Sequence, residues 1–257
     1  ERAKLHEQVV AQERVNRDID AGRKIQQTFL PGDWPEIPGY TFFANYEPAY
    51  TVGGDYYGFI PLPDNRLVIT LGDVAGKGLA AALLMARLSS EVRYSAIHAA
   101  DPVAAVHSLN QIIQEDWPED RFVTLLYMLL DLNDHTLSIV NAGHMPPLLR
   151  NRTGRVDTIG LDRSGPPLNT VVGYPYEGVT LTLRPGSTLL VYTDGVTDAR
   201  NSSGVDFGPE RLVSTLRDAP ADPGRAGDAV IRAVRSYSAG TPQFDDIALV
   251  CFGRNAK

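Results

Sequence analysis

Residues 67–78 read L-V-I-T-L-G-D-V-A-G-K-G, and the rest of the chain is organised around this stretch. Its first five residues are mostly apolar and β-branched, which predicts a short buried strand. A glycine ends that run, and Asp73 follows it. Gly76 and Gly78 then allow a tight turn and a close approach of the backbone to a ligand. An alanine-rich helix starts directly afterwards, so the stretch predicts a strand, an acidic glycine-rich turn and a helix that together hold a site rigidly.

Two other interpretations of these glycine-rich motifs fail on details of the sequence. A phosphate-binding P-loop would need one more residue between its glycines, and Gly78 stands where that loop carries Ser or Thr. Upstream, Gly53-Gly-Asp-Tyr-Tyr shares its start with the signature of diguanylate cyclases. That signature continues with an acidic residue and Phe, whereas two tyrosines follow here.

Composition narrows the class of protein. The chain has 257 residues, of which 43% are hydrophobic, enough for one large domain with an appendage. The single cysteine, Cys251, excludes an intramolecular disulfide framework and suits a reducing compartment, so we expect a cytoplasmic protein. No apolar run reaches membrane-span length and no signal peptide opens the chain, which predicts no membrane insertion. The net charge of −7 argues against nucleic-acid binding, but not against phosphorylated substrates, because bound divalent metals can invert the local charge.

Residues 1–30 predict a long helix with a narrow apolar stripe. The stripe consists of Leu5, Val9, Val15, Ile19, Ile25 and Phe29. The helix could dock on its own domain, or it could be a coiled-coil segment that continues from an upstream part and pairs with a second copy. The chain starts inside the pattern without a cap, which favours the coiled coil and therefore a homodimer. Pro31, Pro35 and Pro38 end the helix and mark a linker.

From residue 40 onward the hydrophobic period changes to two, and helical stretches interrupt the strands. Expected strands cover 40–46, 56–62, 67–71, 122–131, 137–141, 148–149, 179–183, 188–193 and 247–252. Expected helices cover 77–98, 101–115, 209–216 and 224–236. The strands at 122–131 and 137–141 are expected to pair across Asn133-Asp134. Many antiparallel strands with inserted helices predict an α+β layered architecture.

Acidic residues recur beside glycines or turns at the ends of several expected strands. The positions are Asp55, Asp73, Asp194 and the neighbours Asp245 and Asp246. Carboxylates that converge from separate strand ends form the oxygen-rich sites that magnesium and manganese prefer. Each carboxylate taken alone is better explained as an ordinary turn residue, because Asp is common in turns. The shared placement is therefore what predicts a metal site.

Five motifs together resemble the PPM family of metal-dependent serine/threonine phosphatases, and most of all its bacterial branch of the SpoIIE and RsbU type. They are Gly53-Gly-Asp-Tyr-Tyr, Gly72-Asp-Val-Ala-Gly-Lys-Gly-Leu-Ala-Ala-Ala, Asn141-Ala-Gly-His-Met-Pro-Pro, Tyr192-Thr-Asp-Gly-Val-Thr-Asp-Ala and Asp245-Asp-Ile. The resemblance runs in order from about residue 25 to residue 252. It implies two packed antiparallel sheets flanked by helices, with residues 1–30 as a linker helix and residues 31–257 as the catalytic domain.

The resemblance also assigns roles to the acidic residues. Asp73 should bridge two divalent ions, manganese or magnesium, with the Val74 carbonyl beside it. Asp194 and Asp245 should hold the first ion, and Asp55 should serve the second.

Other positions carry less definite expectations. Asp246 is the alternative to Asp245, because the sequence does not fix which neighbour points inward. Asp198 resembles a residue behind the ligands or a ligand of a third ion. His144 is either near the metals or a turn-stabilising residue, and Lys77 is expected only to start a helix. No residue matches the proton donor of the human-type relatives, so no general acid is assigned.

The resemblance implies hydrolysis of phosphoserine or phosphothreonine on a signalling protein, by water activated between two metal ions. In the bacterial branch that substrate is a small anti-anti-sigma-type protein, which implies a role in sigma-factor regulation and an upstream sensor domain. The alternative is a catalytically weak or inactive pseudophosphatase that binds partners through the same fold. The intact set of aspartates argues against this alternative.

Overall fold

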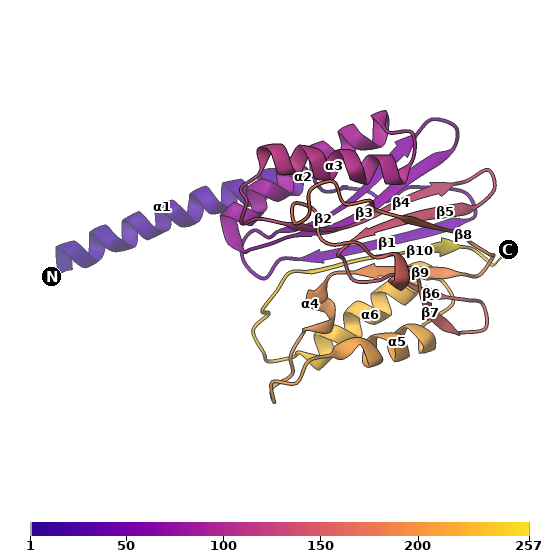
Figure 1. The fold of residues 1–257 in the computed structure, drawn as a ribbon. Coiled ribbons are helices and arrows are strands. Elements are labelled where there is room, and N and C mark those ends of the chain that lie inside the picture. Colours follow the sequence, from indigo (N-terminus) through magenta and orange to yellow (C-terminus); the bar gives the residue numbers. More distant parts are fainter. Residues whose placement is uncertain (1, 257) are drawn as a thin grey trace.

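Two five-stranded antiparallel sheets pack face to face in the structure, a computed structural model that describes residues 2–256 (Figure 1). The first sheet contains, in spatial order, β2 (Asp55–Leu62), β3 (Arg66–Val74), β4 (Val123–Asp131), β5 (Thr136–Ala142) and β8 (Gly178–Thr182). The second contains β1 (Tyr40–Glu47), β10 (Ile247–Arg254), β9 (Thr188–Tyr192), β6 (Leu148–Arg150) and β7 (Val156–Thr158). The expected pairing of 122–131 with 137–141 is confirmed.

Helices cover the outer face of each sheet, so the layers run helix, sheet, sheet, helix (Figure 1). The first sheet is covered by α2 (Gly78–His98) and α3 (Pro102–Asp116), and the second by α5 (Gly208–Asp218) and α6 (Pro223–Tyr237). Short helical turns lie at α4 (Asp194–Thr197) and η1 (Leu161–Arg163). The expected α+β architecture of two packed sheets with flanking helices is therefore correct.

Strand β3 is buried on both faces, which explains why its apolar residues follow one another instead of alternating with polar ones. Leu67, Ile69 and Leu71 point into the core between the two sheets, together with Phe252 of β10. Val68 and the other even-numbered apolar residues point to the opposite face, where they pack under α2 and α3. Because both faces are covered, the segment 67–71 is apolar at every position except Thr70. A Leu71→Ala change at this fully buried position would cost about 2–5 kcal/mol.

The end of β3 differs from the sequence-based expectation. We expected Gly72 to end the strand, but the ladder continues through Val74. Asp73 lies opposite Asp55 of β2 on one side and Thr124 of β4 on the other. Pairing with strands on both sides keeps the backbone extended, so Asp73 belongs to the sheet and not to the turn. The short elements β7 and α4 were not expected, because three or four residues are too few to show a period.

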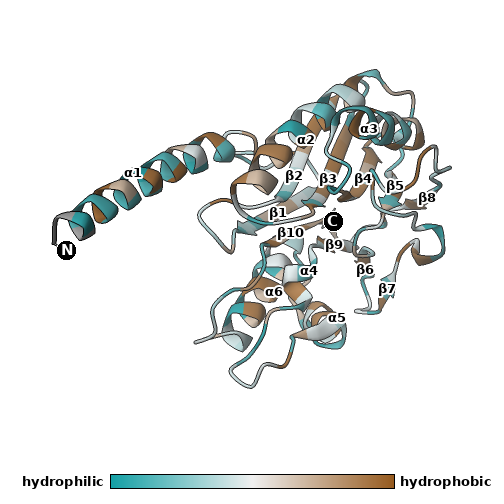
Figure 2. Cartoon of the chain, turned by 60° about the vertical axis from the view of Figure 1, so that its left-hand side comes forward, coloured by the Kyte–Doolittle hydropathy of each residue, from teal (hydrophilic) through white to brown (hydrophobic). Residues whose placement is uncertain are grey.

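The N-terminal helix α1 (Arg2–Gln27) projects away from the sheets and meets the rest of the chain only near its end (Figures 1 and 2). Its apolar residues remain open to solvent, with Val9 48%, Val15 50% and Ile25 61% exposed. The side chain of Leu5 lies outside the described part of the chain. The helix is therefore as expected, but it does not dock along its own domain. None of the helices in residues 2–256, α1 included, is long and apolar enough to cross a membrane.

Candidate metal centre

The predicted acidic residues meet at one edge of the two packed sheets. Asp55 begins β2 and Asp73 lies near the end of β3, so the antiparallel register places them directly opposite each other. Asp194 follows β9 as the first residue of α4, and Asp245 comes just before β10. Because strands of opposite direction begin and end at the same edge, residues far apart in sequence come together here.

Asp55 is almost completely buried, with 2% of its surface exposed. Its carboxylate accepts a hydrogen bond of 2.8 Å from the Thr193 hydroxyl. Burial raises the pKa of Asp55 well above its ordinary value, and the negative charges of Asp73 and Asp246 raise it further. Thr193 acts in the opposite direction, because its hydrogen bond favours the ionised form.

The pKa of Asp73 is also raised by its surroundings. Burial, followed by the charges of Asp194, Asp245 and Asp246, raises the pKa of Asp73 to about 7. Carboxylates that repel one another in this way resist ionisation at neutral pH. A divalent cation placed among them would remove the repulsion and keep all of them charged.

Asp194 and Asp198 lie at the two ends of the short helix α4. Burial raises the pKa of Asp194, and the charges of Asp245 and Asp198 add to the effect. The Asp198 amide donates a hydrogen bond of 2.8 Å to the Asp194 carbonyl, which closes the turn. Asp198 is itself exposed and accepts a weak bond of 3.3 Å from Thr197. It therefore lies behind Asp194, on the solvent side of the cluster.

The neighbours Asp245 and Asp246 have different surroundings. Asp246 is buried, and its carboxylate accepts hydrogen bonds of 2.7 Å from the backbone amides of Ala49 and Gly54. These bonds connect the start of β10 to the loop before β2. Both carboxylate oxygens of Asp246 are therefore already occupied by backbone amides. Asp245 is partly exposed, and its Oδ2 lies 2.8 Å from the amino group of Lys77. This difference favours Asp245 over Asp246 as a carboxylate that is available to a ligand.

Lys77 starts a helix and also bonds to the acidic cluster. It does occupy the position that precedes α2, as expected. Its amino group, however, donates hydrogen bonds of 2.8 Å to Asp245 and 2.6 Å to the Phe244 carbonyl. The side chain therefore connects the glycine-rich turn after β3 to the loop before β10.

His144 is buried close to Asp73 and Asp194, and all three line a small cavity. Burial lowers the pKa of His144 to about 4, so the imidazole is neutral at physiological pH. Its Nδ1 lies 2.8 Å from the Thr124 hydroxyl, while Nε2 is buried without a hydrogen-bond partner. Its backbone amide bonds to the Asn141 side chain at 2.8 Å, so the residue also stabilises the turn. Both expectations for His144 are consistent with this position.

The donor set fits hard divalent cations, which prefer oxygen ligands. The Tyr46 hydroxyl is buried without a hydrogen-bond partner. Burial raises the pKa of Tyr46, and the charges of Asp246, Asp55 and Asp73 raise it further. A buried polar atom without a partner beside several carboxylates leaves a position that water or an ion-bound ligand could satisfy. Within residues 2–256, no three His, Cys, Asp or Glu side chains already stand in a geometry that holds a metal ion.

Sequence reasoning missed three residues that support the cluster. Thr193 bonds to Asp55, Tyr46 reaches into the cluster from β1, and Gln26 holds the loop before Asp55. Thr193 lies within a quoted motif, and Gln26 lies at the start of the region of resemblance, so these positions were the available signal. Tyr46 gave no such signal, because it fits the alternation of an ordinary strand.

Comparison with known proteins places the chain in a family. The stage II sporulation protein E (SpoIIE) family matches residues 63–255. Protein IcfG from Synechocystis sp. is 30% identical over 94% of this chain and 42% of its own length. Phosphoserine phosphatase RsbU from Bacillus subtilis is 26% identical over 75% of this chain and 57% of its own length. The chain therefore spans about half the length of these curated relatives.

Solved structures show the same fold. The SiaA-PP2C domain of Pseudomonas aeruginosa superposes with a TM-score of 0.83 at 22% identity, covering 95% of this chain and 99% of that domain. The two packed sheets and their flanking helices are thus those of a PP2C domain. The family match covers most of the chain and includes Asp73, Asp194 and Asp245. The chain belongs to the SpoIIE family, the bacterial branch of the PPM-type phosphatases.

Proposed function

We propose that the chain is a metal-dependent protein phosphatase that hydrolyses phosphoserine or phosphothreonine. The observation that carries the proposal is the group of carboxylates at one sheet edge, where burial and the mutual repulsion of these groups raise the pKa of Asp73 to about 7. Such a cluster destabilises the metal-free protein, so it is best explained as a site for cations. The name of the relative RsbU, a phosphoserine phosphatase, supports the same activity.

Each acidic residue would have a defined role in metal binding. Asp73 would bridge two ions, Asp194 and Asp245 would hold one, and Asp55 would serve the other. The Val74 carbonyl and Asp198 would assist as neighbouring oxygen donors. When bound, the ions would supply an activated water and neutralise charge on the phosphoryl oxygens. Asp246 and Thr193 would keep the loops and Asp55 in position through the hydrogen bonds described above.

Manganese or magnesium is the expected cofactor. The solved catalytic domain of serine/threonine phosphatase PstP is a complex with two manganese ions, and it shares this fold with a TM-score of 0.57 at 18% identity. The acidic oxygen donors of the present site suit either ion. We propose that the site binds two ions, and that a third binds near Asp198.

The proposed substrate is a small phosphorylated protein of the anti-anti-sigma type, acting in the cytoplasm. The likeness to RsbU supports this, together with an upstream sensor domain in the full-length protein. The exposed apolar residues of α1 support a homodimer formed through that helix.

A direct experiment is hydrolysis of p-nitrophenyl phosphate and of a phosphoserine peptide, measured with manganese, with magnesium and with excess EDTA. A phosphatase gives turnover that depends on the added metal and is lost on Asp73→Asn substitution. A pseudophosphatase gives no metal-dependent turnover but still binds its phosphoprotein partner. Absence of turnover under every metal condition would therefore overturn the proposal in favour of the binding module.

A further inference from the structure

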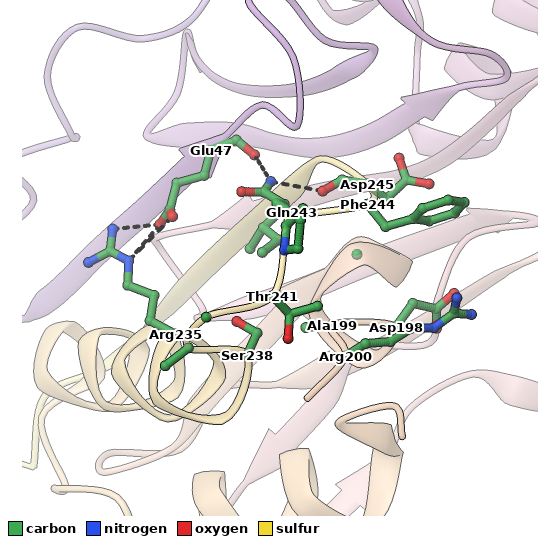
Figure 3. Close-up of a pocket in the computed structure, with 15 residues that line it drawn as sticks. Glu47, Asp198, Ala199, Arg200, Arg235, Ser238, Thr241, Gln243, Phe244 and Asp245 are labelled. Carbon is green, nitrogen blue, oxygen red and sulfur yellow. Dashed lines mark hydrogen bonds and ion pairs between the residues drawn. The ribbon is translucent and has the colours of Figure 1, made fainter. Parts of the chain in front are cut away.

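A pocket of about 450 Å³ opens beside the proposed metal centre (Figure 3). Its walls come from Glu47 at the end of β1, from residues 195–200 around α4, and from residues 235–247 between α6 and β10. Asp198 and Asp245, which also belong to the acidic cluster, are part of these walls. A molecule bound in the pocket would therefore lie directly next to the group that is bound at the metal centre.

The cations around the pocket already have acidic partners. Arg235 pairs with Glu47 at 2.5 Å, as the dashed lines in Figure 3 show. Arg200 pairs with Asp206 at 2.8 Å, and Lys77 pairs with Asp245 at the same distance. An acidic side chain that entered the pocket would lose hydration without gaining a free cation. A cationic side chain would compete with the metal ions that are proposed to bind beside Asp198 and Asp245. The arrangement thus favours an uncharged occupant.

Apolar side chains provide the contact surface. Phe244 is 64% exposed, although it is a large aromatic residue, and its ring forms one wall. Lys77 lies 4.1 Å from the ring centroid and Arg200 lies 5.5 Å from it, so cation–π contacts hold the ring in place. Ala199 and Pro242 continue the apolar surface. An aromatic ring that is both exposed and fixed is a typical anchor for a partner chain.

One polar atom in the pocket is also without a partner. The Thr241 hydroxyl is buried and forms no hydrogen bond within the described residues. A rotation of the Thr241 side chain would present this hydroxyl to a peptide backbone that crossed the pocket, and each peptide unit offers both a donor and an acceptor. Together with the apolar wall, this atom suits a polypeptide segment better than a small polar molecule.

We propose that this pocket binds an uncharged apolar side chain within two residues of the phosphorylated residue, and so selects which phosphoproteins are substrates. The inference rests on the proposed phosphatase activity and adds the chemistry of the substrate segment. A residue two positions away in an extended chain lies at most about 7 Å further along, which matches a pocket that shares its wall with the metal centre. The volume accommodates one large side chain and its adjoining backbone.

The test uses synthetic heptapeptides with a central phosphoserine and alanine elsewhere. Leucine replaces alanine at each of the two positions on either side, and kcat/KM is measured with manganese for the whole chain. At one of these positions the leucine peptide should exceed the alanine peptide at least tenfold, since filling an apolar pocket gives discrimination of this order. Glutamate or lysine at that position should give no gain.

Two variants change the pocket from opposite walls. Phe244→Ala removes the aromatic wall, and Ala199→Leu fills the space. Each should reduce the leucine-to-alanine ratio below about threefold, given the size of contact that is lost. The ratio is taken within each variant, so a general loss of activity cancels. Tyr94→Ala is the matched control, because Tyr94 is an aromatic residue on α2 with 56% exposure and does not line the pocket. Its ratio should equal that of the unmodified chain.

The outcomes separate the two proposals. If the peptides are hydrolysed but leucine gives no gain at any position, the pocket proposal is overturned and the phosphatase activity stands. A ratio that is unchanged in both Phe244→Ala and Ala199→Leu, with folding verified by circular dichroism, also overturns it. If no peptide and no p-nitrophenyl phosphate is hydrolysed under any metal condition, the proposed function fails and the pocket proposal fails with it.

Discussion

The side-chain amide of Gln26 pairs with both backbone polar groups of Gly53. Its Nε2 donates to the Gly53 carbonyl at 2.6 Å, and the Gly53 amide donates to its Oε1 at 3.3 Å. Gln26 lies at the end of α1, and Gly53 lies two residues before Asp55. The helix that projects from the domain is thus joined at its base to the loop that positions a proposed metal ligand.

Replacing Gln26 should therefore disturb the metal centre from a distance. Gln26→Leu leaves the Gly53 amide and carbonyl buried without partners, which costs about 1–3 kcal/mol. We expect a lower free energy of unfolding and weaker manganese binding, measured by denaturant titration and calorimetry. The neighbouring Gln27 is exposed, so Gln27→Leu is the matched control and should change stability by no more than about 0.5 kcal/mol. Equal effects of the two substitutions would contradict the coupling.

The exposed stripe on α1 leads to a prediction about regulation. An isolated helix of this length is marginally stable in water, so α1 should pack on a second copy or on another part of the full-length protein. Removing residues 1–20, which leaves Gln26 and its bonds to Gly53 in place, should therefore reduce the number of copies per particle and alter turnover, measured by light scattering and steady-state kinetics. Polar substitutions at Val15 and Ile19 should reproduce the change. If the number of copies per particle and the kinetics are identical with and without these residues, the helix is only a tether.

Asp73→Asn should abolish activity and at the same time stabilise the metal-free protein. In the native state the pKa of Asp73 is about 7, compared with an ordinary value of 3.8. Between these values the native state binds more protons than the unfolded state, so stability in EDTA should fall as the pH rises from about 4 to 7. Each pKa unit corresponds to roughly 1.4 kcal/mol. Thermal unfolding at several pH values should show this decline in the unmodified chain and a flatter profile in Asp73→Asn.

A control at the surface makes the Asp73 test specific. The side chain of Asp120 is 77% exposed, so Asp120→Asn should keep both the activity and the pH profile. Near-normal manganese-dependent turnover in Asp73→Asn would contradict its role as a bridging ligand.

Asp245 and Asp246 should respond differently to alanine. Asp245→Ala should reduce activity sharply with little loss of stability, because its carboxylate is partly exposed and bonds mainly to Lys77. Asp246→Ala should destabilise the fold, because the buried amides of the loop at residues 49–54 lose their acceptor. Combining Asp194→Ala with Asp245→Ala should cost little more than either change alone, since residues that serve one ion act as a unit. If Asp246→Ala removes activity without loss of stability, Asp246 and not Asp245 is the ligand.

Activity should require manganese or magnesium and should not require the thiol. Oxygen ligands bind these ions reversibly, so EDTA should abolish turnover and added metal should restore it. Cys251 is completely buried in β10, and burial raises the pKa of its thiol to about 12. Iodoacetamide should therefore leave the native enzyme unmodified and active, as mass spectrometry and turnover would show. Full activity after exhaustive chelation would indicate a different chemistry.

The layered α+β fold and the candidate acidic residues could be predicted from the amino-acid sequence alone. Period-two apolar runs located most strands, because the hydrophobic pattern is local and each sheet buries a defined face. Glycines beside Asp55 and Asp73 indicated a site, since they permit a close approach of the backbone. The long helix at residues 1–30 could also be predicted, because this segment contains apolar residues at helical spacing and almost no proline or turn-forming sequence before Pro31.

The way in which these parts meet depends on contacts between segments that are far apart in the sequence. The different surroundings of Asp245 and Asp246 arise from backbone amides almost 200 positions away in the sequence, which no local pattern encodes. The same holds for the bond between Lys77 and Asp245 and for the extension of β3 through Asp73, which neighbouring strands impose. Sequence periodicity reports which face of an element is buried. Pairing across the sheet edge determines which side chains share one electrostatic environment, and that environment sets the pKa of Asp73.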